Sequence, residues 1–466
     1  MAEQEFDVVV VGAGPAGEVL AGRVAERSNK SVAIVENHLV GGECSFYACM
    51  PSKALLRPAE VLDELGRVPG VRDAEASIDV DAVFERRDTI VNGLSDDNQV
   101  PWLESRDIAL FRGNGRLAGE RRVEVGDDTL VAREAVVLAT GTGAAIPPVD
   151  GLAEASAWTN REVTTASEVP GTLLILGGGV VGVEMAQAWR SLGSRVTLVE
   201  RDDHILGREE PFAGEQVADA LRAEGVDVRT GAQAERVDHD DSGFTLVLGD
   251  GDSISGSHLL VATGRKPLTD DLGLEQVGLE PGGFVEVDEQ MRVHGHQWLF
   301  AVGDVNGRAL LTHMGKYQGR IVADIVLGAT AGGSGTEPRA LEGGRGHRGL
   351  APRVVFTHPQ VGAVGHTLAS AQEAGLPVRE IDLPTAGTAG AAFVGRGADQ
   401  TTRFIVDTDR EVLVGVTFVG PGVAEMVHAA TIAVVGEVPL STLIHAIPSF
   451  PTRSELWLNF IEAYGL

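Results

Sequence analysis

The stretch DVVVVGAGPAGEVLAGRVAE, residues 7–26, opens with a run of valines, turns through three glycines and continues as an amphipathic helix. A second apolar run, SVAIVE (31–36), follows it and ends in an acid. This order of apolar run, Gly-x-Gly-x-x-Gly turn, helix and apolar run predicts a βαβ unit with parallel strands. The same design recurs in GTLLILGGGVVGVEMAQAWRSLG (171–193) and SRVTLVE (194–200), so the chain carries it twice.

Each copy has the pattern of a dinucleotide-binding turn. The first glycine permits a tight bend, the second lets a pyrophosphate approach the backbone, and the third allows the helix to pack closely on the strand. The acid at the end of the second strand would accept hydrogen bonds from ribose hydroxyls. The residues in these positions are Gly12, Gly14, Gly17 and Glu36 in the first copy, and Gly177, Gly179, Gly182 and Glu200 in the second.

Two such sites indicate two dinucleotides, and the natural pair is FAD and a nicotinamide nucleotide. A carboxylate at Glu200 would repel the 2′-phosphate of NADPH and therefore favours NADH. Arg201, the next residue, weakens that preference. We therefore predict FAD and NADH as cofactors, with NADPH less favoured.

The composition is typical of a globular protein that stays in water. Of 466 residues, 43% are hydrophobic and 23% are charged. No apolar run approaches the roughly 18 residues of a membrane span, and the acidic start MAEQEFD is unlike a secretory signal. The net charge of −29 would repel nucleic acid and anionic membranes. We therefore expect a cytoplasmic protein that binds neither of them. Basic residues are almost all arginine, and the lysines are Lys30, Lys53, Lys266 and Lys316.

The cysteines of the chain are Cys44 and Cys49, both in GGECSFYACMPSK (41–53). A structural disulfide is disfavoured in a reducing cytoplasm, and two cysteines are too few ligands for a structural zinc site. Inert thiols and a redox-active dithiol remain open. Bonded cysteines have Cα atoms roughly 4.4–6.8 Å apart, which is closer than residues five apart on a regular helix. A disulfide therefore requires the segment to bend between the two cysteines.

This segment resembles the active-site stretch of the class I FAD-dependent pyridine nucleotide–disulfide oxidoreductases, a family that includes dihydrolipoyl dehydrogenase, glutathione reductase and mercuric reductase. Members of the family have two glycines, then Cys-x4-Cys, then Pro-Ser-Lys or a close variant. The resemblance covers nearly the whole chain. It includes both glycine turns, ATG (139–141), ATGRKP (262–267), AVGD (301–304), LTH (311–313) and VVFTHPQVGAVG (354–365), the last of which resembles the start of the family's dimerisation domain.

The resemblance implies a role for individual residues. Cys49 would lie against the flavin, and Cys44 would be the interchange thiol that meets the substrate. Lys53 would lie near the flavin N5 and pair with Glu184, where a cation would stabilise the negative charge of the reduced flavin. Asp304 would hold the flavin's ribityl chain. The remaining positions that the resemblance assigns to cofactor binding are Gly42, Thr140, Gly141, Gly264, Arg265 and Gly303.

The chain departs from the family near its C-terminus. In the disulfide-reducing members, a His-Pro-Thr segment with a glutamate five residues after the histidine reaches into the active site of the partner subunit in a homodimer. This chain has Phe450-Pro451-Thr452, with Glu455 at the glutamate position. A phenyl ring carries no proton, and general acid–base catalysis is typically worth about 10²–10⁴-fold. The resemblance therefore implies a homodimer whose usual acid–base residue is missing.

Three enzymatic interpretations remain open. The first is a dihydrolipoyl dehydrogenase-like dithiol–disulfide oxidoreductase in which His445 or a substrate group supplies the proton, although a surface or interface histidine is the better interpretation of His445. The second is an NAD(P)H-dependent reductase of quinones or metal ions, as in mercuric reductase, but without the C-terminal cysteine pair usual there. The third resembles 2-oxopropyl-coenzyme M reductase/carboxylase, which shares the phenylalanine but has a histidine where this chain has Glu455. A redox-inactive FAD-binding homologue is the non-enzymatic alternative.

The sequence thus predicts an α/β protein with two Rossmann-like dinucleotide-binding domains and a C-terminal α+β dimerisation domain. The expected boundaries are 1–150 for the first part of the FAD domain and 151–270 for the nicotinamide domain. The second part of the FAD domain and a Gly-rich linker would span 271–350. The dimerisation domain would span 351–466, with antiparallel strands and a last helix at about 453–463.

Overall fold

The computed structural model describes residues 2–70, 76–328, 350–395, 397 and 399–466. It divides into two compact units, each assembled from separate stretches of the chain. The first unit comprises 1–51, 88–144 and 265–348, and the second comprises 52–87, 145–264 and 349–466. The predicted Gly-rich linker falls almost entirely on residues 329–349, outside the described residues. Within the described ranges, no helix combines the length and the apolar character needed to cross a bilayer.

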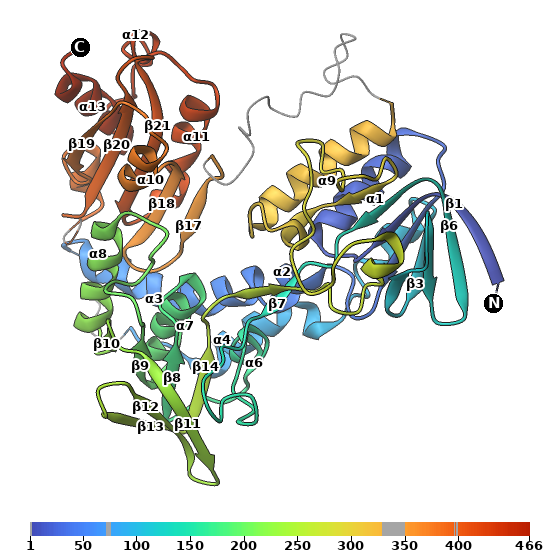
Figure 1. Ribbon diagram of the computed structural model, residues 1–466. Coiled ribbons are helices and arrows are strands. Elements are labelled where there is room, and N and C mark those ends of the chain that lie inside the picture. The colour runs from blue at the N-terminus through green and yellow to red at the C-terminus, as the bar shows by residue number, and fades with distance from the viewer. Residues whose placement is uncertain (1, 71–75, 329–349, 396, 398) are drawn as a thin grey trace. The chain divides into compact units, whose positions relative to one another are not determined.

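A largely parallel sheet forms the centre of the first unit (Figure 1). Its strands follow the order β3-β2-β1-β6-β5-β4, with β16 beside β6. The valines of β1 are buried on both faces, as expected for a central parallel strand. The bounds are β1 (Ala2–Val11), β2 (Val32–Glu36), β3 (Ile108–Arg112), β4 (Gly115–Leu117), β5 (Arg122–Val125), β6 (Asp128–Leu138) and β16 (Leu299–Ala301), with β7 (Thr142–Ala144) paired to β15 (Arg265–Pro267).

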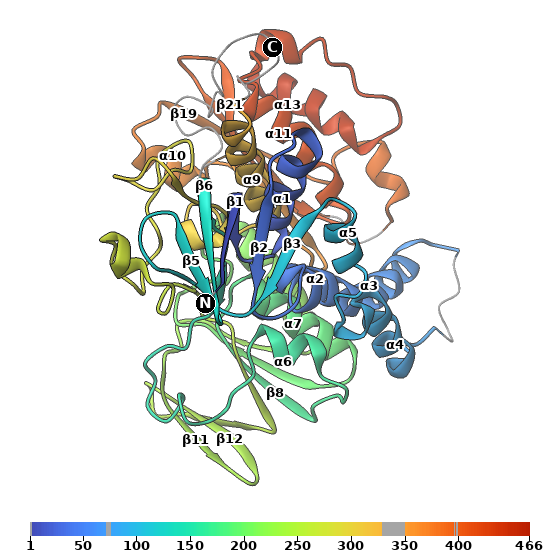
Figure 2. The same ribbon diagram turned by 90° about the vertical axis from the view of Figure 1, so that its right-hand side faces the viewer.

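Helices α1 (Pro15–Arg27) and α9 (Thr312–Val326) lie side by side in the first unit (Figure 2). Small residues permit this approach, because a Cβ atom on Gly319 would lie 2.6 Å from the Ala16 carbonyl oxygen. An ion pair between Arg23 and Asp324, at 2.6 Å, joins the far ends of the contact. The other helices of this unit are α2 (Gly42–Phe46), α5 (Val100–Glu104) and the 3₁₀ turns η1 (Asn92–Leu94), η2 (Leu274–Val277) and η3 (Gly303–Asn306).

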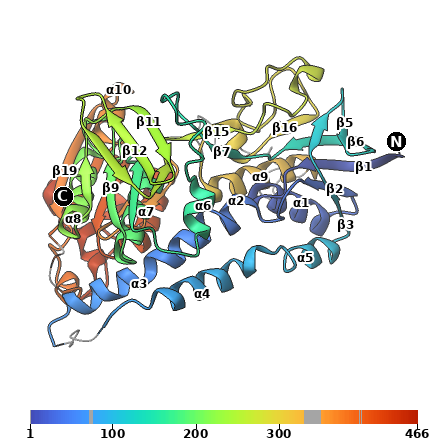
Figure 3. The ribbon, with the colours of Figure 1, turned by 90° about the horizontal axis from the view of Figure 1, so that it is seen from below.

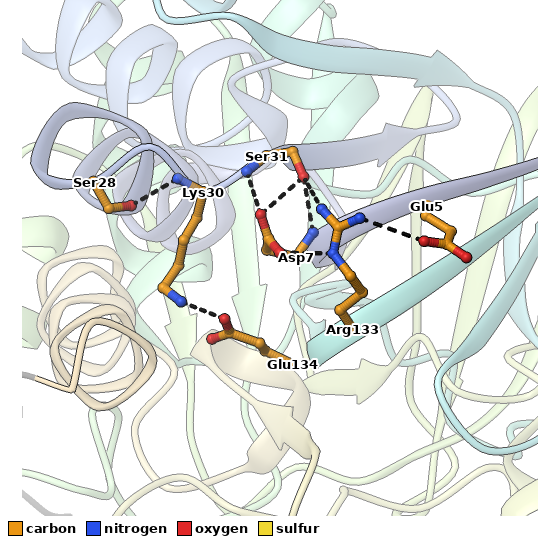
Figure 4. A network of polar contacts seen from close by, with 7 residues as sticks. All are labelled: Glu5, Asp7, Ser28, Lys30, Ser31, Arg133 and Glu134. Carbon is orange, nitrogen blue, oxygen red and sulfur yellow. Dashed lines mark hydrogen bonds and ion pairs between the residues drawn. The ribbon is translucent and has the colours of Figure 1, made fainter.

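A polar network fixes the entry of β1 and β2 into this sheet (Figure 4). Asp7 accepts hydrogen bonds from the Ser31 backbone N–H at 2.7 Å and from Arg133 Nε at 2.8 Å. The bond from Arg133 is the main cause that lowers the pKa of Asp7 to about 2. Lys30 forms an ion pair with Glu134 beside this network. These contacts connect the first strands of the sheet to β6, about a hundred residues later in the sequence.

The second unit contains another parallel sheet, with the strand order β10-β9-β8-β14. Helix α7 connects β8 to β9 and completes the second predicted βαβ unit. An antiparallel β11-β12-β13 sheet follows it along the chain. The bounds are α6 (Asn160–Thr165), β8 (Thr172–Leu176), α7 (Val180–Ser191), β9 (Arg195–Val199), α8 (Pro211–Ala223), β10 (Asp227–Arg229), β11 (Ala234–Asp240), β12 (Gly243–Leu248), β13 (Ser253–Gly256) and β14 (His258–Val261).

Two helices from the early part of the chain contribute to the second unit. Helix α3 (Cys49–Arg67) begins at the boundary of the first unit, and α4 (Val80–Ile90) follows it. They run next to each other in Figure 3, and Arg86 Nη1 donates a hydrogen bond to the Ala54 carbonyl at 3.3 Å. The sequence therefore places Lys53, on α3, in the unit that also contains the second glycine turn.

The C-terminal part of the second unit is an antiparallel sheet, as predicted, with the order β17-β18-β21-β20-β19. Phe404 and Phe460 stack at 4.3 Å between ring centroids and join this sheet to the last helix. The predicted helix at 453–463 is a 3₁₀ turn followed by an α-helix. The bounds are β17 (Arg353–Val355), β18 (Gln360–Gly365), α10 (Leu368–Glu373), β19 (Val378–Pro384), η4 (Gly390–Phe393), β20 (Thr401–Asp407), β21 (Val412–Gly420), η5 (Val423–Glu425), α11 (Val427–Val435), α12 (Leu440–Leu443), η6 (Arg453–Glu455) and α13 (Leu456–Tyr464).

The predicted fold class is confirmed: two parallel sheets, each with a glycine turn and a following helix, are combined with an antiparallel C-terminal sheet. The predicted domain boundaries stay predictions.

Candidate active site

The two cysteines lie on either side of a helix break. Cys44 is on the short helix α2, which ends at Phe46, and Cys49 is the first residue of α3. Gly42 opens α2 with a φ of 60°, and a Cβ atom there would lie 2.9 Å from the Gly14 Cα atom. Helix α2 therefore packs directly on the first glycine turn. The bend that the sequence requires between the cysteines is present.

The Cys44 and Cys49 side chains interact with each other. The Thr312 hydroxyl at the start of α9 lies 3.4 Å from Cys49 Sγ. The hydrogen bond with Cys49 and burial raise the pKa of Cys44, whereas Thr312 and the Lys316 ammonium lower it. The two cysteine side chains are therefore neighbours, and Thr312 lies beside them.

Phe46 and Tyr47, between the cysteines, belong to the interior of the first unit. Phe46 is 1% exposed and packs in a small cluster with Tyr47 and Val91. The Tyr47 hydroxyl is hydrogen-bonded to His38 Nε2 at 2.8 Å. Packing therefore accounts for these two large side chains.

The first glycine turn leaves an open space beside its middle glycine. A Cβ atom on Gly12, whose φ is 108°, would lie 2.3 Å from the Ala139 carbonyl oxygen, and one on Gly17 would lie 2.0 Å from the Gly12 carbonyl oxygen. A Cβ atom added to Gly14 would have no heavy atom of the described residues within 4 Å. The turn is therefore closed where it meets the sheet and open where a pyrophosphate would approach the helix N-terminus.

The second glycine turn repeats this geometry. A Cβ atom on Gly177 would lie 2.5 Å from the Ala262 carbonyl oxygen, and one on Gly182 would lie 2.0 Å from the Gly177 carbonyl oxygen. A Cβ atom on Gly179 would lie 4.0 Å from its nearest neighbour, the Ala262 carbonyl oxygen. Both turns thus fit the pyrophosphate of a dinucleotide.

The acids that follow the two turns have equivalent partners. Glu36 accepts hydrogen bonds from the backbone N–H groups of Ala13 and His38, both at 2.8 Å. Glu200 accepts them from Gly178 at 2.6 Å and from Asp202 at 2.9 Å. Each carboxylate therefore holds its glycine turn against the end of the second strand. Their contact with ribose hydroxyls stays a prediction.

Asp304, in η3, lies in a polar cluster of the first unit. Its carboxylate accepts a hydrogen bond from the Thr142 hydroxyl at 2.9 Å, and Arg265 Nε donates to that hydroxyl at 3.0 Å. Burial raises the pKa of Asp304. Of the other predicted cofactor positions, Thr140 donates to the Leu268 carbonyl at 3.0 Å, and the Gly303 backbone N–H donates to Gln318 Oε1 at 2.7 Å.

Lys53 and Glu184 form an ion pair in the second unit. Lys53 Nζ lies 2.7 Å from Glu184 Oε2 and 4.8 Å from the centroid of the Phe356 ring. The other carboxylate oxygen of Glu184 accepts the Phe356 backbone N–H at 3.0 Å. Glu184 is 2% exposed, so its charge is neutralised within the unit. Their predicted role beside a flavin stays a prediction.

The segment that departs from the family pattern lies on the surface of the second unit. Phe450 is 77% exposed and His445 is exposed as well. Glu455, at the end of η6, accepts the Gly390 backbone N–H at 3.3 Å. The 3₁₀ turn and Gly390 therefore position Glu455. Its predicted catalytic role stays a prediction, as does that of His445.

Two family models match the chain and decide its family. The model of the pyridine nucleotide-disulphide oxidoreductase family matches residues 6–319, and the model of its dimerisation domain matches residues 351–459. The chain belongs to this family. The resemblance seen in the cysteine segment is thereby confirmed.

Relatives from several branches of the family are similar over almost their full length. A mercuric reductase from Streptomyces lividans is 32% identical over 97% of this chain and 94% of its own. A dihydrolipoyl dehydrogenase from Thermus scotoductus is 31% identical over 98% and 97%. Among solved structures, the Cu(II) complex of the HOCl-induced flavoprotein disulfide reductase RclA from Escherichia coli has a TM-score of 0.83 at 25% identity, over 98% of this chain and 99% of that one.

This pyridine nucleotide–disulphide oxidoreductase is accordingly an FAD-dependent enzyme, and members of its family use FAD and NAD(P)H. Its matched dimerisation domain supports a homodimer. The open spaces at Gly14 and Gly179 fit one dinucleotide each, in agreement with the two cofactors.

Sequence reasoning missed several polar residues that the fold brings to the cysteines. Thr312 and Lys316 are on α9, more than 260 residues after Cys49 in the chain. Glu43, next to Cys44, lies 4.0 Å from Arg265. The scarcity of lysine was the one signal in the sequence that could have identified Lys316.

Proposed function

We propose that this enzyme is an NADH-dependent dithiol–disulfide oxidoreductase in which Cys44 and Cys49 exchange two electrons with an external dithiol or disulfide. The observation that carries the proposal is the pair of interacting cysteine side chains beside Thr312. Two thiols in this arrangement can close to a disulfide and reopen, and cysteines at helix starts have the polarity that stabilises thiolates. Inert structural thiols need no such partners.

The residues present fit the two cofactors. The turn at Gly14, with Glu36 behind it and the Asp304 cluster in the same unit, would hold FAD. The turn at Gly179, with Glu200 behind it, would hold the nicotinamide nucleotide. When bound, FAD and NADH supply the transfer of two electrons to the thiol pair.

The chain's own side chains would complete the site. Glu184 keeps Lys53 oriented through a direct ion pair, and a cation held in this way suits a place where negative charge accumulates. Glu200 supports NADH over NADPH, and Arg201, 77% exposed, forms an ion pair with Asp202 at 3.4 Å. The charge of Arg201 is thus already paired with the neighbouring Asp202 and is less available to a 2′-phosphate.

Anaerobic reduction with NADH tests the proposal. We expect the oxidised holoenzyme to contain no alkylatable thiol and the reduced holoenzyme to contain two, Cys44 and Cys49. Lipoamide should then reoxidise the enzyme and remove both thiols from the count. A reduced holoenzyme whose thiol count does not change, or one that no disulfide reoxidises, would contradict the proposal.

A second candidate is the reduction of a thiophilic metal ion. A mercuric reductase is among the relatives with over 30% identity, and thiolates are the ligands that soft metals prefer. Within the described residues there is no group of three or more His, Cys, Asp or Glu side chains that could hold a metal. Such an ion would therefore be held by Cys44 and Cys49 as a substrate. NADH oxidation that depends on mercuric ion but not on lipoamide or quinones would favour this candidate.

A further inference from the structure

Thiol exchange needs a thiolate at Cys44, because the thiolate and not the thiol is the nucleophile. The chain has no histidine at the family's acid–base position, where Phe450 stands. Burial and the neighbouring thiol of Cys49 also disfavour ionisation of Cys44. Some other group must therefore favour the thiolate for exchange to be efficient.

Helix α9 brings two such groups to the cysteines. The Thr312 hydroxyl is hydrogen-bonded to Cys49 at 3.4 Å, so the first turn of α9 faces the thiol pair. Lys316 follows four residues later and therefore lies on the same face of the helix. Electrostatic attraction from Lys316 acts on Cys44, in the direction that favours the thiolate.

Helix α1, which carries Glu18, packs against α9, which carries Lys316. The two helices meet next to these residues, because a Cβ atom on Gly315 of α9 would lie 3.3 Å from the Ala16 Cβ atom of α1. Gly315 directly precedes Lys316, and Ala16 is two residues before Glu18. Burial raises the pKa of Glu18 to about 7, Lys316 acts to lower it, and Glu36 acts to raise it. Lys316 is thus within electrostatic reach of both Cys44 and Glu18.

Lys316 differs from the other lysines of the chain. Lys30, Lys53 and Lys266 each form an ion pair with a carboxylate. In the described part of the chain, Lys316 forms none, and it is exposed. Its charge is therefore available to a thiolate, and it is open to an approaching substrate.

We propose that Lys316 stabilises the Cys44 thiolate in place of the missing imidazolium, and that Glu18 sets the strength of this effect. The inference rests on the proposed thiol exchange. Glu18 acts through Lys316 and is a positioning residue, because its carboxylate competes with the thiolate for the same ammonium group. No residue of the partner subunit is needed for this stabilisation.

The exchange that follows is balanced. The Cys44 thiolate attacks one sulfur of an external disulfide R–S–S–R, forms the mixed disulfide Cys44–S–S–R and releases R–S⁻, which takes a proton from water. Cys49, after its thiol has given a proton to water, then attacks the Cys44 sulfur and closes the Cys44–Cys49 disulfide. This releases the second R–S⁻, which also takes a proton from water. Two electrons pass from the enzyme to the external disulfide, which becomes two thiols.

The Cys49→Ser holoenzyme isolates the thiol in question, since Cys44 is then the chain's single cysteine. The rate of alkylation by iodoacetamide, followed between about pH 5 and 9, reports the thiolate fraction of Cys44. Lys316→Met should lower this rate at pH 7 about threefold to fivefold in dilute buffer, as expected for an exposed charge. The loss should largely disappear at roughly 1 M salt, where the screening length is about 3 Å.

Glu18→Gln in the same background should have a different signature. Below pH 6 Glu18 is largely protonated, so the variant should match its parent. Above its pKa of about 7 the carboxylate is charged, so its removal should make alkylation about twofold to threefold faster. Lys30→Met and Glu134→Gln are matched controls, because they remove the same charges from an ion pair in the same unit, and neither should alter the profile (Figure 4).

Three results would overturn the proposal: an unchanged rate in Lys316→Met, a loss equal to that in Lys30→Met, or a loss that salt does not reduce. Flavin absorbance of each variant identifies any that fails to fold, and Lys316→Arg, which keeps the charge, should restore the rate. Failure of the proposed function is a separate result. It would appear as a wild-type holoenzyme that reduces no disulfide, whatever the alkylation profile of Cys44.

Discussion

Lys53 Nζ lies 2.7 Å from Glu184 Oε2, although the two residues are 131 positions apart in the chain. The pair is asymmetric, because the Lys53 side chain is 34% exposed and that of Glu184 only 3%. The carboxylate depends on its partner more than the ammonium does, since a buried charge without a partner costs several kcal/mol. The Phe356 backbone N–H supplies the second hydrogen bond to Glu184.

Lys53→Met should therefore destabilise the enzyme by about 2 kcal/mol, because it leaves the buried Glu184 carboxylate with a single donor. Glu184→Gln should cost less, since the amide oxygen still accepts the Phe356 N–H. Denaturant unfolding of the two variants and of the double variant would give the coupling energy, which we expect to be roughly 1 kcal/mol.

Lys266→Met is the matched control for this measurement. It forms an ion pair with Asp270 in which the lysine side chain is 52% exposed and the aspartate side chain 62% exposed. Such exposed pairs contribute about 0–1 kcal/mol to stability. Equal losses in Lys53→Met and Lys266→Met would show that burial of Glu184 does not determine the effect.

Phe450→His should increase turnover with lipoamide. Phe450 is 77% exposed, so the substitution should leave the fold intact. A histidine there would supply the acid–base group that the resemblance to the family assigns to this position, and such a group is typically worth about 10²–10⁴-fold. We expect kcat/KM for lipoamide to rise at least about tenfold, with a new dependence on a group that titrates near pH 6.5.

Phe393→His is a suitable control, because Phe393 is 73% exposed in the same unit and has no assigned role. It should leave lipoamide turnover unchanged. If Phe450→His also leaves it unchanged, the absence of a histidine at position 450 is not what limits thiol exchange in this enzyme.

The features that could be predicted from the sequence are those that local backbone chemistry determines. The turns at Gly12 and Gly177 require glycine because any Cβ atom would overlap a carbonyl oxygen. This requirement appears in the sequence as the Gly-x-Gly-x-x-Gly spacing. The bend between Cys44 and Cys49 follows from the geometry of a helix in the same way. Such features need no knowledge of distant packing.

The surroundings of the thiols could not be predicted by local reasoning. Thr312 reaches Cys49 only because α9 packs on α1 through Gly315 and Gly319, and nothing in the sequence of either helix specifies the other as its partner. The pairing of Lys53 with Glu184 was expected only from the resemblance to a family. Contacts between residues hundreds of positions apart depend on the whole fold, and a single sequence records them weakly.

The enzyme should prefer NADH, and Glu200→Gln should reduce that preference. The Glu200 carboxylate, held by the backbone of Gly178 and Asp202, would repel a 2′-phosphate at the same strand end. Removal of one charge at a short distance in a solvated site is worth about 1 kcal/mol, or roughly fivefold in relative kcat/KM for NADPH over NADH. Arg201→Ala should change the ratio less than twofold or so, since Arg201 is exposed and paired with Asp202. A wild-type enzyme that uses NADPH more efficiently would contradict the assignment.

His358 should make the enzyme less stable in acid. Its side chain is buried, and Nε2 has no hydrogen-bond partner among the described residues. Burial lowers the pKa of His358 to about 4, and the nearby charges of Glu60, Arg67 and Arg57 modify this effect. The unfolded chain takes up the proton at about pH 6.5, which the folded state does only near pH 4, so stability should be complete above pH 6.5 and fall between pH 6.5 and 4. His358→Gln should reduce the slope of unfolding free energy against pH in that window and leave it unchanged above pH 7. Equal slopes for the two proteins would show that His358 is already charged in the folded state.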